Sequence, residues 1–470
     1  MTQEVHAAVD GALVMIGFGS IGRGVLPLIE RHIGFDRSRF TVIEPSADFA
    51  HILRDHGIRH LQLALTPENF AETLRGLFPE GRGMIVNLSV EVDSVSLMKV
   101  AQEIGVLYVD TVVEPWPGHY FDAALSNAER TNYALRERAR ALAAVSAGKP
   151  TAVSSCGANP GMVSWLLKEA LLRLAADTGV AADPKDRDGW AALMRDLGVK
   201  GIHIAERDTQ VSARPKPRGV FVNTWSVDGF LSESFQPAEL GWGTHEKKLP
   251  PQGHAFTHGP RHAIWIDRPG GDTRVRSWCP GGPQFGHLVT HNESLSIADY
   301  YTVRQDGTAV YRPTCHYAYN PCNDAILSLH EVKGAGQLPT ETHILAADEI
   351  IDGADDLGVL LYGHAKGAMW YGSRLSCDEA RQLAPYQNAT GMQVTSSVLA
   401  AMVWAAGNPR AGVVEADEMD HARCLEVQRP YLGRIECHYT DWTPLAHRIN
   451  SFAEDRDEDD PWQFTNFLAI

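Results

Sequence analysis

A glycine-rich turn near the start of the sequence most constrains what this chain can fold into. Residues 12–16 are apolar and of strand length, and a helix-like segment, residues 23–31, follows the turn. The G-x-G-x-x-G pattern between them permits a tight turn, close approach of a pyrophosphate and close helix packing. The phosphates would lie at the amino end of the helix. We therefore predict dinucleotide binding, with a structural glycine turn as the alternative; the predicted residues are Gly17, Gly19, Ser20, Ile21 and Gly22.

An acidic residue at the end of the next predicted strand indicates which dinucleotide would bind. Glu44 closes the strand at residues 41–44 and follows Gly22 by 22 residues. A carboxylate at this place accepts hydrogen bonds from the adenosine ribose hydroxyls and repels a 2′-phosphate. The sequence therefore favours NAD over NADP. The alternative is a strand-end carboxylate that merely precedes Pro45.

Apolar strands alternate with helices through the first third of the chain. Further strands are predicted at residues 84–88, 106–110 and 151–154, with helical stretches between them. This pattern predicts an α/β fold, a Rossmann-type doubly wound parallel sheet, over residues 1–158. We expect a helix near 390–406 to complete it, within a C-terminal segment, 385–470, that returns to this domain and carries the acidic run 454–460.

Short polar side chains stand at the predicted strand ends, which face the ligand crevice of such sheets. Turn formation and helix capping are the alternative roles for them. Asn159 precedes a helix and could contact either substrate or cofactor. The predicted cofactor contacts at strand ends are Asn87, Leu88, Ser89, Asp110, Thr111, Ser154 and Cys156.

The residue composition and the predicted secondary structure change after about residue 160. A predicted helix at 163–176 precedes a region rich in Trp, Gly, Pro and His, in which short segments alternate like antiparallel strands. This predicts a second, α+β substrate domain over residues 159–384. The strand candidates are residues 261–266, 274–278, 287–291 and 300–304.

Composition excludes several classes of protein. The chain has 42 Lys plus Arg against 58 Asp plus Glu, a formal charge of -16, which argues against nucleic-acid binding because phosphate contacts need a basic face. No apolar stretch is long enough to cross a bilayer, and the start lacks a secretory signal, so we expect a cytoplasmic protein. Seven cysteines without close pairing fit reduced thiols, and no residue spacing typical of a metal site is present, so no metal is predicted.

Carboxylates and aromatic residues are interleaved beyond the first domain, as a pocket for amines requires. Carboxylates stabilise ammonium groups through charge-assisted hydrogen bonds, and indole faces stabilise them through cation–π attraction. The alternative is ordinary surface carboxylates and core tryptophans, and a lone His291 is equally open to a structural role. The candidate residues are Glu114, Glu206, Trp225, Glu233 and His291.

Several long peptides are much more specific than the glycine turn, and through them the chain resembles the bacterial homospermidine synthases, relatives of the saccharopine dehydrogenase group. The resemblance covers nearly the whole length. Where that family usually has Asp after the Asn-Leu-Ser run, this chain has Glu91. The peptides are MIGFGSIGRG (15–24), VDTVVEPW (109–116), CGANPGMVSW (156–165), GIHIAERDTQ (201–210), FVNTWSV (221–227), PAELGWGTHEK (237–247) and VTHNESLSIADY (289–300).

The resemblance implies a homodimer, with dimerisation assigned to the second domain, and tightly held NAD. It implies that one putrescine is oxidised to an imine, that a second amine displaces ammonia, and that the same hydride reduces the new imine to give homospermidine. The sequence leaves open whether spermidine or another diamine is also used. By resemblance, Trp225 faces the cationic intermediates, Glu114, Glu206 and Glu233 position amines, and Asn159 and His291 line the same site.

Two rival functions remain at this point. An amino-acid dehydrogenase of the saccharopine type would release NADH and bind a substrate carboxylate, which needs a convergent pair of arginines. The candidates for such a pair are Arg207, Arg274, Arg276 and Arg312. The second rival is a catalytically silent NAD-binding sensor, which would bind cofactor without releasing ammonia from amines.

Overall fold

The computed structural model describes residues 4–448 and 456–469. The chain divides into two compact units, which are described separately. Unit 1 comprises residues 4–122, 135–162 and 378–431, and unit 2 comprises 123–134, 163–377, 432–448 and 456–469.

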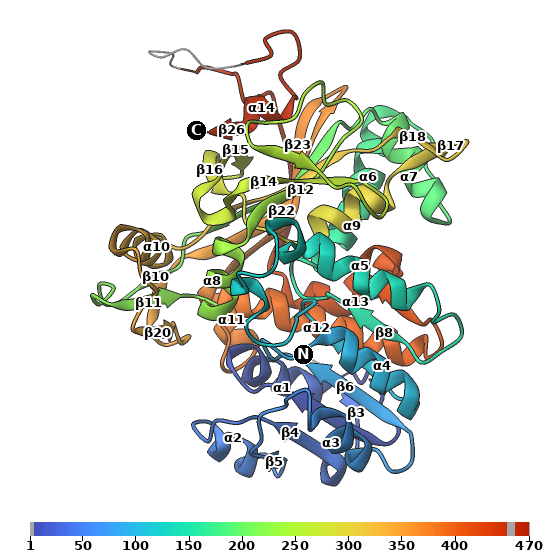
Figure 1. The fold of residues 1–470 in the computed structure, drawn as a ribbon, viewed down its shortest axis with the longest axis vertical. Coiled ribbons are helices and arrows are strands. Elements are labelled where there is room, and N and C mark those ends of the chain that lie inside the picture. Colours follow the sequence, from blue (N-terminus) through green and yellow to red (C-terminus); the bar gives the residue numbers. More distant parts are fainter. Residues whose placement is uncertain (1–3, 449–455, 470) are drawn as a thin grey trace. The chain divides into compact units, whose positions relative to one another are not determined.

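Unit 1 contains the predicted parallel sheet (Figure 1). Every neighbouring pair in its strand order is parallel. The order is β24 (Val413–Glu415), β8 (Ala152–Ser154), β7 (Leu107–Asp110), β6 (Gly83–Asn87), β2 (Ala12–Ile16), β4 (Phe40–Ile43) and β5 (Arg59–Leu61). Strands buried on both faces must be apolar throughout, which explains why these segments are continuous apolar runs.

Helices pack on this sheet through one large apolar cluster and one long buried helix. Alternate residues of β2 meet Leu74 of α3 (Phe70–Leu77), Val95 of α4 (Ser94–Ile104) and Leu135 of α5 (Asn132–Ala143). The helix expected near 390–406 is α12 (Ala389–Gly407), which packs against α1 (Ser20–His32), α13 (His421–Gln428) and β7. A helix that is apolar all round is a buried one, and α12 is buried along nearly its whole length.

Unit 2 is built on a mixed sheet, in agreement with the predicted α+β class. β9 and β19 are parallel neighbours, and the other pairs along the main order are antiparallel. The order is β13 (Gly253–Ala255), β14 (Ala263–Pro269), β12 (Pro237–Gly241), β19 (Thr314–Asn320), β9 (Gly201–Asp208), β22 (Ala354–His364), β23 (Gly367–Ser376) and β25 (Arg434–Thr440), with β16 (Gly282–His287), β15 (Arg274–Cys279) and β26 (Leu468–Ala469) branching from β19.

Smaller elements of unit 2 surround this sheet. The helices are α6 (Met162–Thr178), α7 (Arg187–Asp196), α8 (Val227–Phe235), α9 (Asn292–Tyr300) and α10 (Asn323–Ala335). Three two-stranded ribbons are formed by β11 (Val220–Asn223) with β20 (Glu341–Ile344), β10 (Val211–Ser212) with β21 (Ile350–Asp352), and β17 (Val303–Gln305) with β18 (Thr308–Tyr311) within the described residues.

Two expected strands of the second domain differ from the structure. Residues 288–291 do not form a strand, because β16 ends at His287 and His291 caps the amino end of α9. The segment 300–304 is divided in the same way, since α9 ends at Tyr300 and β17 begins at Val303. Alternation of apolar residues in a short window did not separate a strand from a buried helix end.

The C-terminal segment also differs from the prediction. Only its first part returns to unit 1, because β25 pairs with β23 and β26 pairs with β15 of unit 2. Residues 454 and 455 of the acidic run lie outside the described residues. Further along the run, Asp457 and Asp460 form ion pairs with Lys247 and Lys200 and so fasten this segment to unit 2.

Candidate active site

The glycine turn of unit 1 is shaped as a phosphate cradle. Gly17 has a φ of +90°, and a Cβ there would lie 2.8 Å from the backbone of Leu88, so only glycine fits. A Cβ on Gly22 would lie 2.6 Å from the carbonyl oxygen of Gly17. Around Gly19, by contrast, the space is open, and Gly19 is the N-cap of α1, whose first turn carries no acidic side chain. This open helix terminus suits an anionic ligand.

Glu44 stands beside this cradle. Its carboxylate accepts hydrogen bonds from the backbone N–H of Phe18 at 2.8 Å and of Ser46 at 2.9 Å. Each oxygen is engaged once, and the side chain is partly exposed, so it retains lone pairs for ribose hydroxyls. These two hydrogen bonds therefore hold the carboxylate beside the glycine turn.

A buried chain of hydrogen bonds crosses the ends of three neighbouring strands. The Asn87 amide donates to the Tyr108 hydroxyl at 3.3 Å, and that hydroxyl donates to Asp110 at 2.7 Å. The other Asp110 oxygen accepts the backbone N–H of Ser155 at 2.6 Å. Burial raises the pKa of Asp110 to about 7. Asp110 is thereby suited to positioning the loop that follows β8.

The predicted cofactor residues at strand ends differ in accessibility. Leu88, Ser89 and Thr111 are partly exposed, as are Ser20 and Ile21 of the turn, and so can touch a ligand. The side chains of Asn87, Asp110, Ser154 and Cys156 are buried, and burial raises the pKa of the Cys156 thiol. Buried side chains do not meet a ligand directly, so a positioning role in cofactor binding is our proposal for these four.

The loop after β8 holds two polar groups without partners. Ser155 has a φ of +58°, a strained value for a residue with a side chain. The Ser155 hydroxyl and the Asn159 Nδ2 are both buried and make no hydrogen bond in the described structure. Buried polar groups of native proteins normally have partners, so these two atoms are suited to a ligand. Glu114, which follows β7, is also buried and accepts the N–H of Glu91 at 3.5 Å.

In unit 2, β9 and β19 present a carboxylate and two tyrosines on one face. Their register places Glu206 beside Tyr319, and the Tyr317 hydroxyl donates to Glu206 Oε2. Burial raises the pKa of Glu206 to about 8, although the Tyr317 hydrogen bond opposes this effect. Asp208, two residues on, is likewise buried. It accepts hydrogen bonds from neutral donors, the Thr224 hydroxyl at 2.6 Å and the backbone N–H of Gln210.

His291 is held between two carboxylates. Its Nε2 lies 3.2 Å from Glu233 Oε2, and its Nδ1 lies 3.1 Å from both oxygens of Glu293. Burial lowers the pKa of His291, but the charges of Glu293 and Glu233 outweigh it and place the pKa well above the usual value. An imidazolium here leaves the surrounding carboxylates in excess, because Glu206 and Asp208 are also present.

Trp225 lies in the connection between β11 and α8 and is partly buried. Its indole N–H donates to the Tyr319 hydroxyl at 2.8 Å, and its ring centroid lies 5.9 Å from that of Phe230. Tyr319 stacks on Tyr317 with centroids 5.1 Å apart, and Tyr317 lies 4.4 Å from the His291 ring. We call the set Glu206, Asp208, Trp225, Glu233, His291, Glu293, Tyr317 and Tyr319 the acidic–aromatic cluster.

Four members of the cluster were missed by the sequence analysis, namely Asp208, Glu293, Tyr317 and Tyr319. The alternation of residues 314–320 was a usable signal, since it places Tyr317 and Tyr319 on the same face of a strand. Three of the four candidate arginines of a carboxylate-binding site donate to backbone carbonyls outside the cluster, and the fourth, Arg274, is exposed. The donations run from Arg207 to Gly281, from Arg276 to Leu468 and from Arg312 to Trp242.

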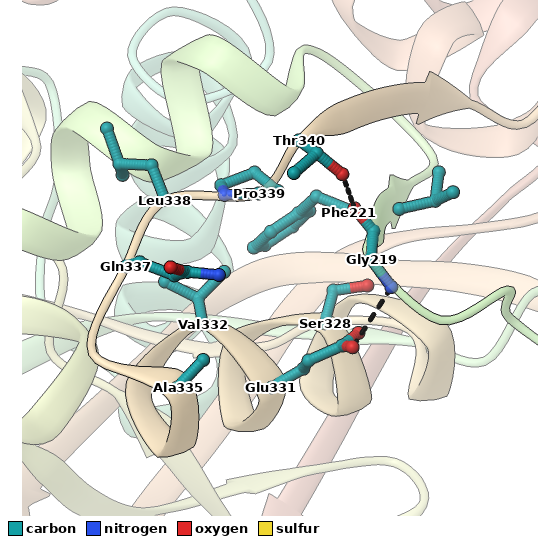
Figure 2. Close-up of a pocket in the computed structure, with 11 residues that line it drawn as sticks. Gly219, Phe221, Ser328, Glu331, Val332, Ala335, Gln337, Leu338, Pro339 and Thr340 are labelled. Atoms are coloured by element: carbon teal, nitrogen blue, oxygen red, sulfur yellow. Dashed lines mark hydrogen bonds between the residues drawn. The ribbon is translucent and has the colours of Figure 1, made fainter.

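A separate recess of unit 2 has a different character. Figure 2 shows it between α10 and the β11–β20 ribbon, with Phe221 and Pro339 in its wall. Its volume is about 60 Å³, and its one acidic side chain, Glu331, is engaged by Lys216 and by the Gly219 N–H. This small recess is unsuited to a diamine. Elsewhere within residues 4–448 and 456–469, no three His, Cys, Asp or Glu side chains are grouped so as to hold a metal ion.

Comparison with known proteins places the chain in a family. The model described as the saccharopine dehydrogenase NADP binding domain matches residues 13–153, and that described as the saccharopine dehydrogenase C-terminal domain matches residues 157–441. Homospermidine synthase of Mesorhizobium japonicum is 59% identical over 99% of this chain and 98% of its own length. The chain belongs to the homospermidine synthase family. The homospermidine synthase of Blastochloris viridis, 58% identical over 99% of this chain and 98% of its own, agrees with this placement.

Solved structures support the same placement. The crystal structure of homospermidine synthase from Legionella pneumophila in complex with NAD is 39% identical, covers 100% of both chains and has a TM-score of 0.92. Saccharopine dehydrogenase of Saccharomyces cerevisiae shares the fold, with a TM-score of 0.50 at 11% identity over 92% of this chain and 100% of its own. The resemblance drawn from the long peptides is thus confirmed, and so is the predicted α/β class with a second α+β domain.

Proposed function

We propose that this protein condenses two putrescine molecules to homospermidine and ammonia, with bound NAD and no net redox change. The observation that carries the proposal is the acidic–aromatic cluster, in which ion pairs, hydrogen bonds and ring contacts connect carboxylates, an indole and two phenols to one histidine. A buried excess of carboxylates is costly unless cations neutralise it, and diammonium ions supply them. The family of the relatives supports polyamines as the substrate class.

The residues of unit 1 fit NAD. The open cradle at Gly19, the carboxylate of Glu44 and the partnerless atoms of Ser155 and Asn159 are complementary to phosphates, ribose hydroxyls and a carboxamide. NAD, when bound, accepts a hydride from the first amine-bearing carbon and returns it to the product. Glu44 favours NAD over NADP, and the NAD found in the Legionella pneumophila relative supports this choice.

Amine binding is assigned to the cluster. Glu206 Oε2 accepts a hydrogen bond from the Tyr317 hydroxyl, which leaves Oε1 for a substrate nitrogen. Because burial raises the pKa of Glu206 to about 8, this group can exchange a proton with an amine near neutral pH. Glu233, whose carboxylate is held in place by His291, attracts a second nitrogen through its charge, and Trp225 stabilises the cationic imine without an ion pair that would fix it too firmly. Asn159 and Glu114 are proposed to orient the same substrate.

Water must be kept from the imine until the second amine attacks it. The nitrogen of the second putrescine adds to the imine carbon, a proton passes from it to the first nitrogen, and that nitrogen then leaves as ammonia while the new imine forms. Aromatic side chains of the cluster limit the approach of water, since Tyr317 and Tyr319 are buried and stack on each other.

The experiment that tests the proposal is incubation of the purified protein with putrescine and a catalytic amount of NAD. We expect homospermidine and ammonia in equal amounts without steady NADH accumulation. Stoichiometric NADH release supports the saccharopine-type dehydrogenase instead, and binding of NAD without any product supports a sensor.

We further propose a homodimer in the cytoplasm. The cysteines of the described chain are all free thiols, which agrees with a reducing compartment. Over the residues that the structure describes, no helix has the length and apolar character to span a bilayer. Light scattering on the purified protein would test the dimer, and fractionation of the source cells would test the location.

A further inference from the structure

The phenol of Tyr319 is held rigidly from several sides. Its side chain is fully buried, its ring stacks on Tyr317 at an interplanar angle of 13°, and it meets Phe230 edge-on with centroids 5.5 Å apart. Its strand, β19, has pairing partners on both sides, β9 and β12. An atom carried by such a side chain has a fixed position in unit 2.

Trp225 is held much less firmly. It lies in the short connection between β11 and α8, is partly exposed, and meets Phe230 only in a tilted contact at 5.9 Å. Its one hydrogen bond in the described structure is the 2.8 Å donation to the Tyr319 hydroxyl. Rotation about either side-chain torsion would turn the indole face, and cation–π attraction depends on a cation lying over that face.

Tyr319 also connects the indole to the carboxylate. It stands opposite Glu206 in the parallel pairing of β19 and β9. Burial, together with the charges of Glu206 and Asp208, raises the pKa of Tyr319 well above its usual value, so the phenol stays neutral and can accept the indole N–H at any working pH. One hydrogen bond therefore fixes the aromatic face relative to the carboxylate.

We propose that Tyr319 is a positioning residue, which orients the indole of Trp225 beside Glu206 so that the polyamine cation meets both. The proposal rests on the proposed function and adds a residue to it. Tyr319 acts through Trp225 rather than on the reacting atoms.

The test is Tyr319→Phe, which removes one oxygen atom and keeps the packed ring. We expect a folded protein whose kcat/KM for putrescine falls about tenfold, mainly through KM, because the cation loses an aligned ring. The chain has 11 tryptophans, so the orientation of one is followed by 19F NMR of protein containing 5-fluorotryptophan. The resonance that disappears in Trp225→Phe belongs to Trp225, and it should shift and broaden in Tyr319→Phe.

A double-mutant cycle isolates the interaction. Phenylalanine at 225 has no indole N–H, so Tyr319→Phe should cost less than twofold in a Trp225→Phe background. Tyr362→Phe is the matched control, since that hydroxyl is also buried but has no hydrogen-bond partner among the residues that the structure describes, and its ring packs against His203 and Trp462. Its activity and the Trp225 resonance should match those of the wild type.

Two results would overturn the proposal: an unchanged Trp225 resonance in Tyr319→Phe, or an equal loss from Tyr319→Phe in both backgrounds. The resonance is measured without substrate. If the wild-type protein makes no homospermidine, the proposed function fails while the resonance still decides whether Tyr319 orients Trp225.

Discussion

Substitution of Glu206 by glutamine is the most informative perturbation, because it should lower activity and raise the stability of the folded protein. Burial raises the pKa of Glu206 from 4.5 to about 8. Between these two values the unfolded chain carries an ionised carboxylate and the folded protein carries a protonated one, so folding takes up a proton. The contribution of the Glu206 carboxyl to the free energy of unfolding is fully present below pH 4.5 and is lost as the pH rises toward 8.

The size of this effect at pH 7 follows from the distance between that pH and the pKa of Glu206 in the unfolded chain. The distance from 4.5 to 7 is 2.5 pH units, and at about 1.4 kcal/mol per unit the buried carboxyl lowers the free energy of unfolding by about 3 kcal/mol. Glu206→Gln removes this cost, keeps the size of the side chain and still accepts the Tyr317 hydrogen bond. We therefore expect the substrate-free variant to be more stable than the wild type at pH 7, with a difference that shrinks at pH 5.5, and to form almost no homospermidine.

The assay is urea unfolding at pH 5.5, 7 and 8 with polyamine formation measured in parallel. Putrescine should stabilise the wild type and leave Glu206→Gln almost unchanged. Glu239→Gln is the comparison variant. Burial raises the pKa of that carboxyl to about 7, so an amide there also removes a protonation cost, but the two Glu239 oxygens accept the backbone N–H of Asn132 and Tyr133. An amide keeps only one of these acceptors, and the lost hydrogen bond should reduce the gain in stability by about 1–3 kcal/mol relative to Glu206→Gln. A stability gain in Glu206→Gln that does not depend on pH, or wild-type turnover in that variant, would refute the reasoning.

Three further predictions concern single residues. Trp225→Phe should stay folded with turnover lower by roughly one to two orders of magnitude, and Trp225→Ala should lose more of its turnover. Measuring both the thermal midpoint and the turnover distinguishes a cation–π role of Trp225 from a purely structural role in the core. NADP should bind more weakly than NAD in the wild type, and Glu44→Ser should narrow the gap, as titration calorimetry would show; equal affinities in the wild type contradict the assignment. Asp110→Ala should weaken NAD binding roughly tenfold by releasing the Ser155 N–H, and unchanged affinity by the same titration would exclude the positioning role.

The unit 1 fold could be predicted because its signals are local. A strand, a glycine turn and a helix follow one another within residues 12–31, and continuous apolar strands are required by a sheet buried on both faces. Glu44 could be placed because the register of β2 and β4 brings both strand ends to one edge. The long helix α12 could be predicted because its segment is apolar on all sides, which is typical of a buried helix.

The acidic–aromatic cluster was only partly predictable, because pairing between distant strands assembles it. Glu206 and Tyr317 are separated by 111 residues and meet through the β9–β19 pairing. The Glu233 and Glu293 carboxylates reach His291 from two different helices. No window of sequence contains that information, and the same holds for the pairing of β25 with β23 that moved the C-terminal segment to unit 2.

Return of one hydride to the molecule that gave it is the central claim, and deuterium tests it most directly. Putrescine deuterated at both carbons next to nitrogen is incubated with the protein, catalytic NAD and an excess of unlabelled NADH. The account predicts homospermidine that retains all of its deuterium, because the deuteride taken from the first putrescine is returned to the same carbon before the cofactor exchanges. Product that lacks one deuterium, with labelled NADH in solution, would contradict it.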